Sequence, residues 1–189
     1  NQKNKDLVSV ILPTYNRAWT LKDAIDSVLL QDYPNIELII IDDGSNDTTQ
    51  ELLGAYKTKA VMIRQENKGV SSARNAGIKK SRGELIALLD SDDAWDKRKI
   101  SCQVEFFNQN PEALICQTEE IWIRNGKQVN PKVKHKKPSG MIFELSLNLC
   151  LVSPSAVMMR RKLFELKGYF NEDFTVCEDY DLWLRVSST

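Results

Sequence analysis

Short apolar runs alternate with segments of helical periodicity through the first 110 residues of this 189-residue chain. Connections of only a few residues between such segments are typical of βαβ units. The sequence therefore predicts an α/β fold in which a mainly parallel sheet is flanked by helices. The expected elements, in chain order, are a strand at 7–13, a helix at 21–30, a strand at 36–41, a helix through 52–56, a strand at 60–63, a helix at 69–78 and a strand at 84–89.

The pattern changes after about residue 110. Residues 113–123 predict a longer strand, Asn125-Gly126 a hairpin turn, and Gln128-Val129 a returning strand, so we expect antiparallel pairing here. Residues 131–139 are rich in lysine and lack apolar periodicity, which predicts a mobile loop. That loop is either a solvated run of charge or a flap over phosphates or an anionic acceptor.

The length favours a single domain over residues 1–189. Residues 178–186 have helical spacing and stop without a clear cap, so we expect the chain to be truncated at its C-terminus.

Charge, hydropathy and cysteine spacing argue against a nucleic-acid-binding, membrane-spanning or disulfide-rich secreted protein. The 26 basic and 26 acidic residues balance, so no global field attracts nucleic acid or an anionic membrane. No stretch reaches the roughly 20 apolar residues of a membrane span, and the N-terminus has no signal-peptide core. The cysteines lack paired spacing, and we expect them to be buried free thiols in a cytoplasmic protein; they are Cys102, Cys116, Cys150 and Cys177.

The strand at 84–89 ends in Asp90-Ser91-Asp92-Asp93. Carboxylates crowded at a strand end repel one another unless a cation neutralises them, and oxygen ligands suit Mg²⁺ or Mn²⁺. We therefore expect a metal site on Asp92 with Asp90 close by. The alternative is a solvated acidic turn that caps the next helix.

Polar clusters follow three of the predicted strands, at residues 14–17, 42–45 and 90–93. In parallel sheets, ligands bind outside the carboxyl ends of the strands, so we expect these clusters to converge. Asp42-Asp43 either accepts hydrogen bonds from a base or ribose or forms a simple turn with Gly44. Arg74 either faces a phosphate or pairs with an acidic side chain to hold the shape of the site.

Five segments, taken together and in order, resemble those of family 2 glycosyltransferases with the GT-A fold. The resemblance runs from about residue 7 to the end of the chain. It implies a Rossmann-like sheet with a small antiparallel C-terminal portion, a nucleotide-sugar-binding half at about 7–110 and an acceptor-side half at about 111–189. The segments are Pro13-Thr14-Tyr15-Asn16-Arg17, Asp42-Asp43-Gly44-Ser45, Gly69-Val70-Ser71-Ser72-Ala73-Arg74-Asn75, Asp90-Ser91-Asp92-Asp93 and Glu178-Asp179 through Arg185.

The resemblance implies an inverting, metal-dependent transfer of a sugar from a nucleoside diphosphate sugar, most often UDP-linked. Asp179 is then the base that takes the proton of an acceptor hydroxyl, although an acidic residue there also suits a helix N-terminus. Asp92 and Asp90 are the expected ligands of Mn²⁺ or Mg²⁺. The expected nucleotide-sugar site comprises Pro13, Tyr15, Arg17, Asp42, Asp43, Arg74, Asp90 and Ser91.

The resemblance also implies a saccharide or lipid-linked saccharide acceptor, with membrane association only through regions outside this chain. Two alternatives remain. One is a nucleotide-sugar-binding module without transferase activity. The other is a sugar nucleotidyltransferase, which normally has a glycine-rich basic loop after its first strand, where this chain has Pro13-Thr14-Tyr15-Asn16-Arg17.

Overall fold

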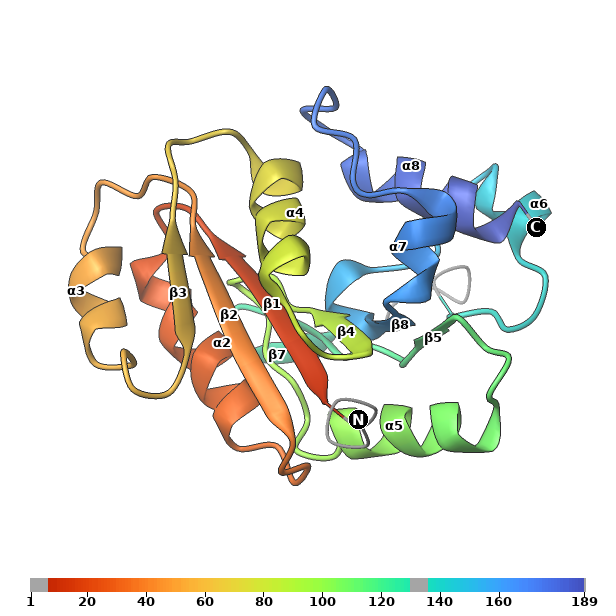
Figure 1. The fold of residues 1–189 in the computed structure, drawn as a ribbon, viewed down its shortest axis with the longest axis horizontal. Helices are drawn as coiled ribbons and strands as arrows, with labels where there is room; N and C mark the ends of the chain where they lie inside the picture. Colours follow the sequence, from red (N-terminus) through yellow and green to blue (C-terminus); the bar gives the residue numbers. More distant parts are fainter. Residues whose placement is uncertain (1–6, 130–135, 189) are drawn as a thin grey trace.

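A computed structural model describes residues 7–129 and 136–188 (Figure 1). Strands and helices alternate as predicted up to β4, and α5 then leads into a region of shorter elements. The elements are β1 (Val8–Thr14), α2 (Ala18–Leu29), β2 (Ile36–Asp42), α3 (Thr49–Gly54), β3 (Val61–Arg64), α4 (Val70–Lys80), β4 (Leu85–Leu88), α5 (Lys99–Gln109), β5 (Ile115–Gln117), β6 (Trp122–Arg124), β7 (Lys127–Val129), α6 (Phe143–Ser146), the 3₁₀ turn η2 (Pro154–Ala156), β8 (Val157–Arg160), α7 (Lys162–Lys167) and α8 (Glu178–Ser187).

Within the described residues, the main sheet has six strands in the order β3-β2-β1-β4-β8-β5. The strands β3, β2, β1 and β4 pair in parallel, whereas β8 is antiparallel to both of its neighbours. A separate ribbon pairs β6 with β7 in antiparallel register. The prediction of a mainly parallel sheet with a small antiparallel portion is therefore confirmed.

Both faces of the sheet are buried. In β1, Val10 and Leu12 pack into a cluster with α2 and α5, whereas Ile11 points to the other face and packs with α4, α7 and α8. Neighbouring residues of a strand point to opposite faces, so a strand covered on both sides must be apolar throughout. The helices therefore form two layers, one on each side of the sheet (Figure 1).

The second half departs from the prediction in its strands and helices. The single strand expected at residues 113–123 is interrupted, because β5 ends at Gln117 and β6 begins at Trp122. The Asn125-Gly126 turn is confirmed: both residues have positive φ, at 50° and 71°, and they join Arg124 to Lys127. Such a turn matches the twist of a two-residue hairpin. The helix α5 and the strand β8 were not predicted.

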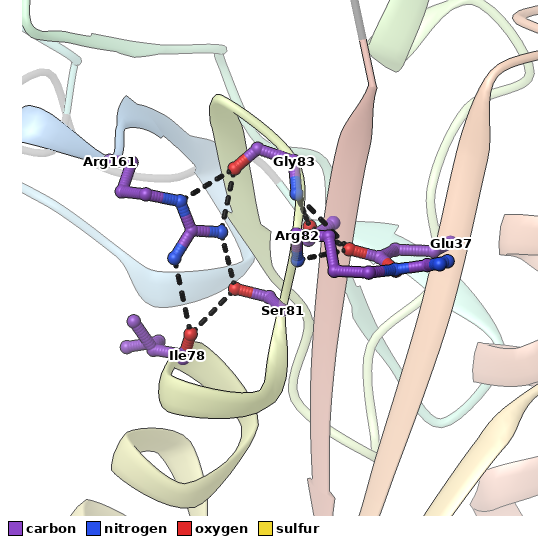
Figure 2. Close-up of polar contacts among 7 residues, drawn as sticks. Glu37, Ile78, Ser81, Arg82, Gly83 and Arg161 are labelled. Atoms are coloured by element: carbon purple, nitrogen blue, oxygen red, sulfur yellow. Dashed lines mark hydrogen bonds and ion pairs between the residues drawn. The ribbon is translucent and has the colours of Figure 1, made fainter. Parts of the chain in front are cut away.

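A polar network fixes the end of the sheet where β1 and β4 begin (Figure 2). The buried carboxylate of Glu37 on β2 accepts hydrogen bonds from the Arg82 backbone N–H (2.6 Å) and the Ser9 hydroxyl (2.5 Å). The Arg161 guanidinium, at the start of α7, donates to the carbonyl oxygen of Gly83 (2.7 Å). A Cβ at Gly83 would lie 2.4 Å from the carbonyl oxygen of residue 7, so this crossing requires glycine. The network ties β1, β2 and β4 to α7.

Burial by itself would raise the pKa of Glu37, but the hydrogen bonds from Ser9 and Arg82 outweigh burial and hold that pKa below its ordinary value. The charged form is therefore the one that this network stabilises.

The cysteines and the lysine-rich segment were also subjects of prediction. The cysteines are free, as predicted, but Cys102, Cys150 and Cys177 are exposed and Cys116 is half-buried, so the expected burial was wrong. Most of the lysine-rich loop predicted at 131–139 lies outside the described residues. No helix in the described ranges is long and apolar enough to cross a membrane.

Candidate active site

The loops that follow β1 and β2 are joined by hydrogen bonds. The backbone N–H of Asp43 donates to the carbonyl oxygen of Thr14 (2.9 Å), and the N–H of Asn16 donates to the Ser45 hydroxyl (2.9 Å). The Asn16 side chain accepts a bond from the Asn46 N–H in return (2.8 Å). Two of the three predicted clusters therefore meet, and the third follows β4, the neighbour of β1 on its other side.

Asp43 is buried and holds the loop that leads into α4. One carboxylate oxygen accepts bonds from the Lys68 N–H (3.0 Å) and the Gln65 side chain (2.7 Å), and the other accepts from the Gly69 N–H (2.8 Å). Gly44 has a φ of +85°, and a Cβ there would lie 2.9 Å from the Asn67 nitrogen. This close approach of two loops explains the glycine.

The other residues predicted at the nucleotide end differ in exposure. Pro13 and Asp42 are buried, and Asp42 accepts a bond from the Ser45 N–H (2.9 Å). Tyr15 and Arg17 are exposed, and the Arg17 guanidinium lies 5.2 Å from the ring centre of Trp19. The exposed aromatic rings and the cation are therefore open to a ligand at this edge of the sheet.

Arg74 joins the segment Asp90-Ser91-Asp92-Asp93 after β4, here called the acidic loop, to the helix α8. Its guanidinium donates to Asp90 (2.8 Å) and to Glu178 (2.8 Å), and its side chain is only 4% exposed. The rigid fork of arginine can serve two carboxylates at once. Of the two roles left open for Arg74, the structure shows the pairing with acidic side chains.

This contact brings the first turn of α8 to the acidic loop, and Asp179 follows Glu178 in that turn. The pKa of the Asp179 carboxyl is raised, first by burial and then by the negative charge of Glu178, while Arg74 partly offsets both. A carboxylate with raised proton affinity is better suited to act as a base. Its side chain also accepts the N–H of Tyr180 (2.8 Å).

Ser155, on η2, holds the acidic loop from the other side. Its hydroxyl oxygen accepts a hydrogen bond from the Asp90 N–H (3.0 Å), and its carbonyl oxygen accepts one from the Trp95 indole (2.7 Å). Its hydroxyl also interacts with the Asp93 carboxylate. Ser155 was not predicted as a site residue, because 65 positions separate it from Asp90 and no local pattern links the two.

The carboxylates of the acidic loop suit a divalent cation whose remaining ligands are phosphate oxygens of a bound substrate. Asp92 is exposed, Asp90 is half-buried and Ser91 is buried. The pKa of Asp93 is raised, first by the loss of water around its carboxyl group and then by the charges of Asp90 and Asp92. Nowhere in residues 7–129 and 136–188 do three or more metal-binding side chains cluster. Mg²⁺ commonly takes only one or two carboxylates together with substrate phosphates, so the residues present suit that arrangement.

A cleft of about 1170 Å³ opens beside the acidic loop. Asp90, Asp93 and Trp95 line one side, the β6–β7 ribbon lines another with Trp122, and Ser155 lies between them. Lys99 is buried in its wall, and burial lowers the pKa of this lysine to about 7. The lining of the cleft comes from the segment after β4, from α5, from the β6–β7 ribbon with the residues before it, and from η2.

The family model described as glycosyl transferase family 2 matches residues 9–166. The chain belongs to this family. An uncharacterized glycosyltransferase of Rickettsia typhi is 36% identical over 190 residues, with 96% of this chain and 60% of the relative covered. The Escherichia coli enzyme WfgD, named a UDP-Glc:alpha-D-GlcNAc-diphosphoundecaprenol beta-1,3-glucosyltransferase, is 34% identical over 182 residues, with 95% and 69% covered.

The fold of this family 2 member matches solved structures. The crystal structure of Staphylococcus aureus TarS 1-349 aligns with a TM-score of 0.78 at 25% identity, with 96% of this chain and 55% of TarS 1-349 covered. This likeness confirms the predicted GT-A fold. The chain spans less than two thirds of the Rickettsia typhi relative and of TarS 1-349.

Proposed function

We propose that this chain carries the catalytic centre of an inverting, metal-dependent glycosyltransferase that moves a sugar from a UDP-sugar to an acceptor hydroxyl. The observation that carries the proposal is the Arg74 bridge. It brings the acidic loop at Asp90 together with Glu178 and Asp179, which lie about 90 positions later in the chain. This bridge supports the proposal that a site for a diphosphate leaving group lies close to the candidate base.

The donor is proposed to lie across the loops after β1, β2 and β4. Tyr15 and Arg17 are exposed there, and the buried Asp43 keeps those loops in place. Pro13, Asp42 and Ser91 complete the proposed nucleotide site. The name of WfgD supports UDP as the nucleotide, because that relative uses UDP-Glc.

Asp92 and Asp90 are the residues that would hold Mn²⁺ or Mg²⁺. When bound, the cation would neutralise charge on the diphosphate and make it a better leaving group. The half-buried Asp90 already accepts from Arg74 with one oxygen, whereas the exposed Asp92 is open to solvent. Asp92 is therefore proposed as the principal ligand.

Asp179 is proposed as the base. It takes the proton of the acceptor hydroxyl while that oxygen bonds to the anomeric carbon, and the bond from this carbon to the diphosphate breaks on the opposite face. The raised pKa of Asp179 favours this proton transfer. The relative WfgD is named for a GlcNAc acceptor linked to diphosphoundecaprenol, which supports a lipid-linked saccharide acceptor. We place this acceptor at the cytoplasmic face of the membrane as part of the proposal.

The test is transfer from a panel of UDP-, GDP- and dTDP-sugars, with Mn²⁺, with Mg²⁺ and with EDTA. We expect UDP release that matches product formation and stops in EDTA. Asp179→Asn should bind UDP as the wild type does but lose transfer, whereas Asp23→Asn, an exposed change on α2, should keep it. UDP binding without transfer from any donor would favour the binding-module alternative. Normal turnover of Asp179→Asn would remove Asp179 as the base.

A further inference from the structure

We infer that Lys99, the first residue of α5, is a positioning residue for the acidic loop. Its buried ammonium group restrains two side chains that hold η2, and η2 in turn holds the backbone of Asp90. The inference rests on the proposed function, because the acidic loop is the proposed metal site. It adds to that site a residue that acts on the loop from behind, without touching a substrate.

The ammonium group of Lys99 contacts two side chains at the base of the cleft. Its nitrogen lies 4.1 Å from the ring centre of Trp95, and it donates a hydrogen bond to the side-chain oxygen of Gln103 (2.6 Å). Lys99 and Gln103 are buried, and Trp95 is half-buried. The attraction between a cation and the face of a tryptophan ring is strongest where water is excluded. Lys99 therefore restrains both side chains.

Both restrained side chains donate to backbone carbonyl groups of η2. The Trp95 indole N–H donates to the carbonyl oxygen of Ser155 (2.7 Å), and the Gln103 amide donates to that of Ala156 (3.1 Å). The Ser155 hydroxyl oxygen then accepts the backbone N–H of Asp90 (3.0 Å). An unbroken series of hydrogen bonds and one ring contact therefore connects the buried ammonium group to the acidic loop.

A charged side chain is unfavourable for the fold at this position. Burial of an ammonium group without an anionic partner costs free energy, and among the described residues no carboxylate forms an ion pair with Lys99. The backbone N–H groups at the start of a helix disfavour a cation as well. A methionine would fill a similar volume without either cost. The fold therefore does not require the charge, and a role in the neighbouring site accounts for it.

The charge of Lys99 changes near neutral pH. Burial lowers the pKa of Lys99 to about 7, and burial also raises the pKa of the Cys116 thiol on β5 to about 11. Cys116 is the one titratable group among the described residues whose charge acts on Lys99, and it stays a neutral thiol near pH 7. Trp95 and Gln103 carry no charge. The ammonium form therefore predominates below about pH 7, and its hold on the Trp95 ring weakens as the pH rises through that value.

Stability and loop positioning respond to this titration in opposite directions. The ordinary pKa of lysine is 10.5, so above about pH 7 the unfolded chain binds more protons at Lys99 than the folded chain does. The free energy of unfolding that depends on Lys99 therefore rises with pH, whereas the hold on the acidic loop falls. A lysine with a structural role alone would make the loop firmer as the fold becomes more stable. The two roles are therefore distinguishable.

The experiment compares the wild type with Lys99→Met and with the control Lys97→Met, which changes an exposed lysine just before α5. Exchange of the Asp90 amide proton with water is measured by NMR in the ligand-free protein at pH 6.5 and pH 8.5. The ratio of the Lys99→Met rate to the wild-type rate at each pH removes the intrinsic pH dependence of exchange. We expect a ratio of about five at pH 6.5 and close to one at pH 8.5. Lys97→Met should give a ratio close to one at both values.

UDP affinity in Mg²⁺ is measured by calorimetry at the same two pH values. The Kd of Lys99→Met should be about five times that of the wild type at pH 6.5 and nearly equal to it at pH 8.5. Taking this ratio cancels the titration of UDP itself. Urea unfolding of the wild type should meanwhile show the free energy of unfolding rising over this range relative to that of Lys99→Met.

Ratios for Lys99→Met that stay the same at both pH values, or a matching effect in Lys97→Met, would overturn the inference. If Lys99→Met does not fold, Trp95→Phe takes its place, because it keeps a ring beside Lys99 but removes the hydrogen bond to Ser155. Its ratios should also be larger at pH 6.5 than at pH 8.5, and constant ratios overturn the inference. A wild type that binds no UDP counts against the proposed function, while the Asp90 amide exchange still judges Lys99.

Discussion

Replacing Arg74 with methionine is expected to lower the free energy of unfolding by about 3 kcal/mol, because it leaves two acidic side chains without their common counterion. The Arg74 side chain is 4% exposed, and its partners Glu178 and Asp90 are 13% and 30% exposed. Removal of one partner from a buried ion pair costs roughly 3–5 kcal/mol. We expect the lower end of that range, since water still reaches Asp90.

The measurement is urea denaturation at pH 7, followed by circular dichroism. Arg74→Lys should fall between the wild type and Arg74→Met, because one ammonium group cannot reproduce the fork that serves both carboxylates. The control is Lys22→Ala, which removes an exposed i,i+4 pair with Asp26 and should cost less than about 0.5 kcal/mol. A cost below about 1 kcal/mol for Arg74→Met would show that the bridge does not stabilise the fold.

Three further changes test the site and the scaffold. Ser155→Ala should weaken Mn²⁺-dependent UDP binding about tenfold in calorimetry, because one lost hydrogen bond to the acidic loop is worth roughly 1.5 kcal/mol; an unchanged Kd would contradict a positioning role. Asp92→Ala should abolish the gain in UDP affinity that Mn²⁺ gives, and a variant that keeps this gain would remove Asp92 from the metal. Glu37→Gln should lower Tm at pH 7 but not at low pH: the folded-state pKa of Glu37 lies below its ordinary 4.5, so its contribution is present above that pH and is lost as the pH falls through the folded value. If the difference in Tm between the wild type and Glu37→Gln is the same at pH 3 as at pH 7, this account is refuted.

The parallel half of the fold could be predicted because its signals are local. Each strand from β1 to β4 is a short, largely apolar run that is followed by polar residues, and the helices after β1, β2 and β3 begin within a few positions. Burial on both faces makes β1, β2 and β4 largely apolar, so these runs stand out from the helical periodicity. The same reasoning placed the loops of Thr14, Asp43 and Asp90 after neighbouring strands.

The parts of the fold and of the site that were not predicted depend on contacts between residues far apart in the sequence. β8 pairs with β4 through distant positions, such as Leu85 with Arg160. A strand of only four residues is too short to be recognised from its local sequence pattern. Ser155 reaches the acidic loop by the same long-range packing. Arg74 was recognised as a site residue, but its choice of partner depended on where α8 docks. The exposure of Cys102, Cys150 and Cys177 was misjudged, because a segment of mixed polarity does not reveal which of its side chains face water.

The β6–β7 ribbon lines a cleft but has no side chain in the hydrophobic core. All six of its strand residues are exposed, so the ribbon adds no side chain to either core cluster. An isolated two-stranded hairpin is marginally stable by itself, and its amides should exchange with deuterium long before those of β1 or β4. Chimaeras that graft another member's ribbon onto this scaffold should therefore fold normally, because the sheet and both core clusters stay unchanged.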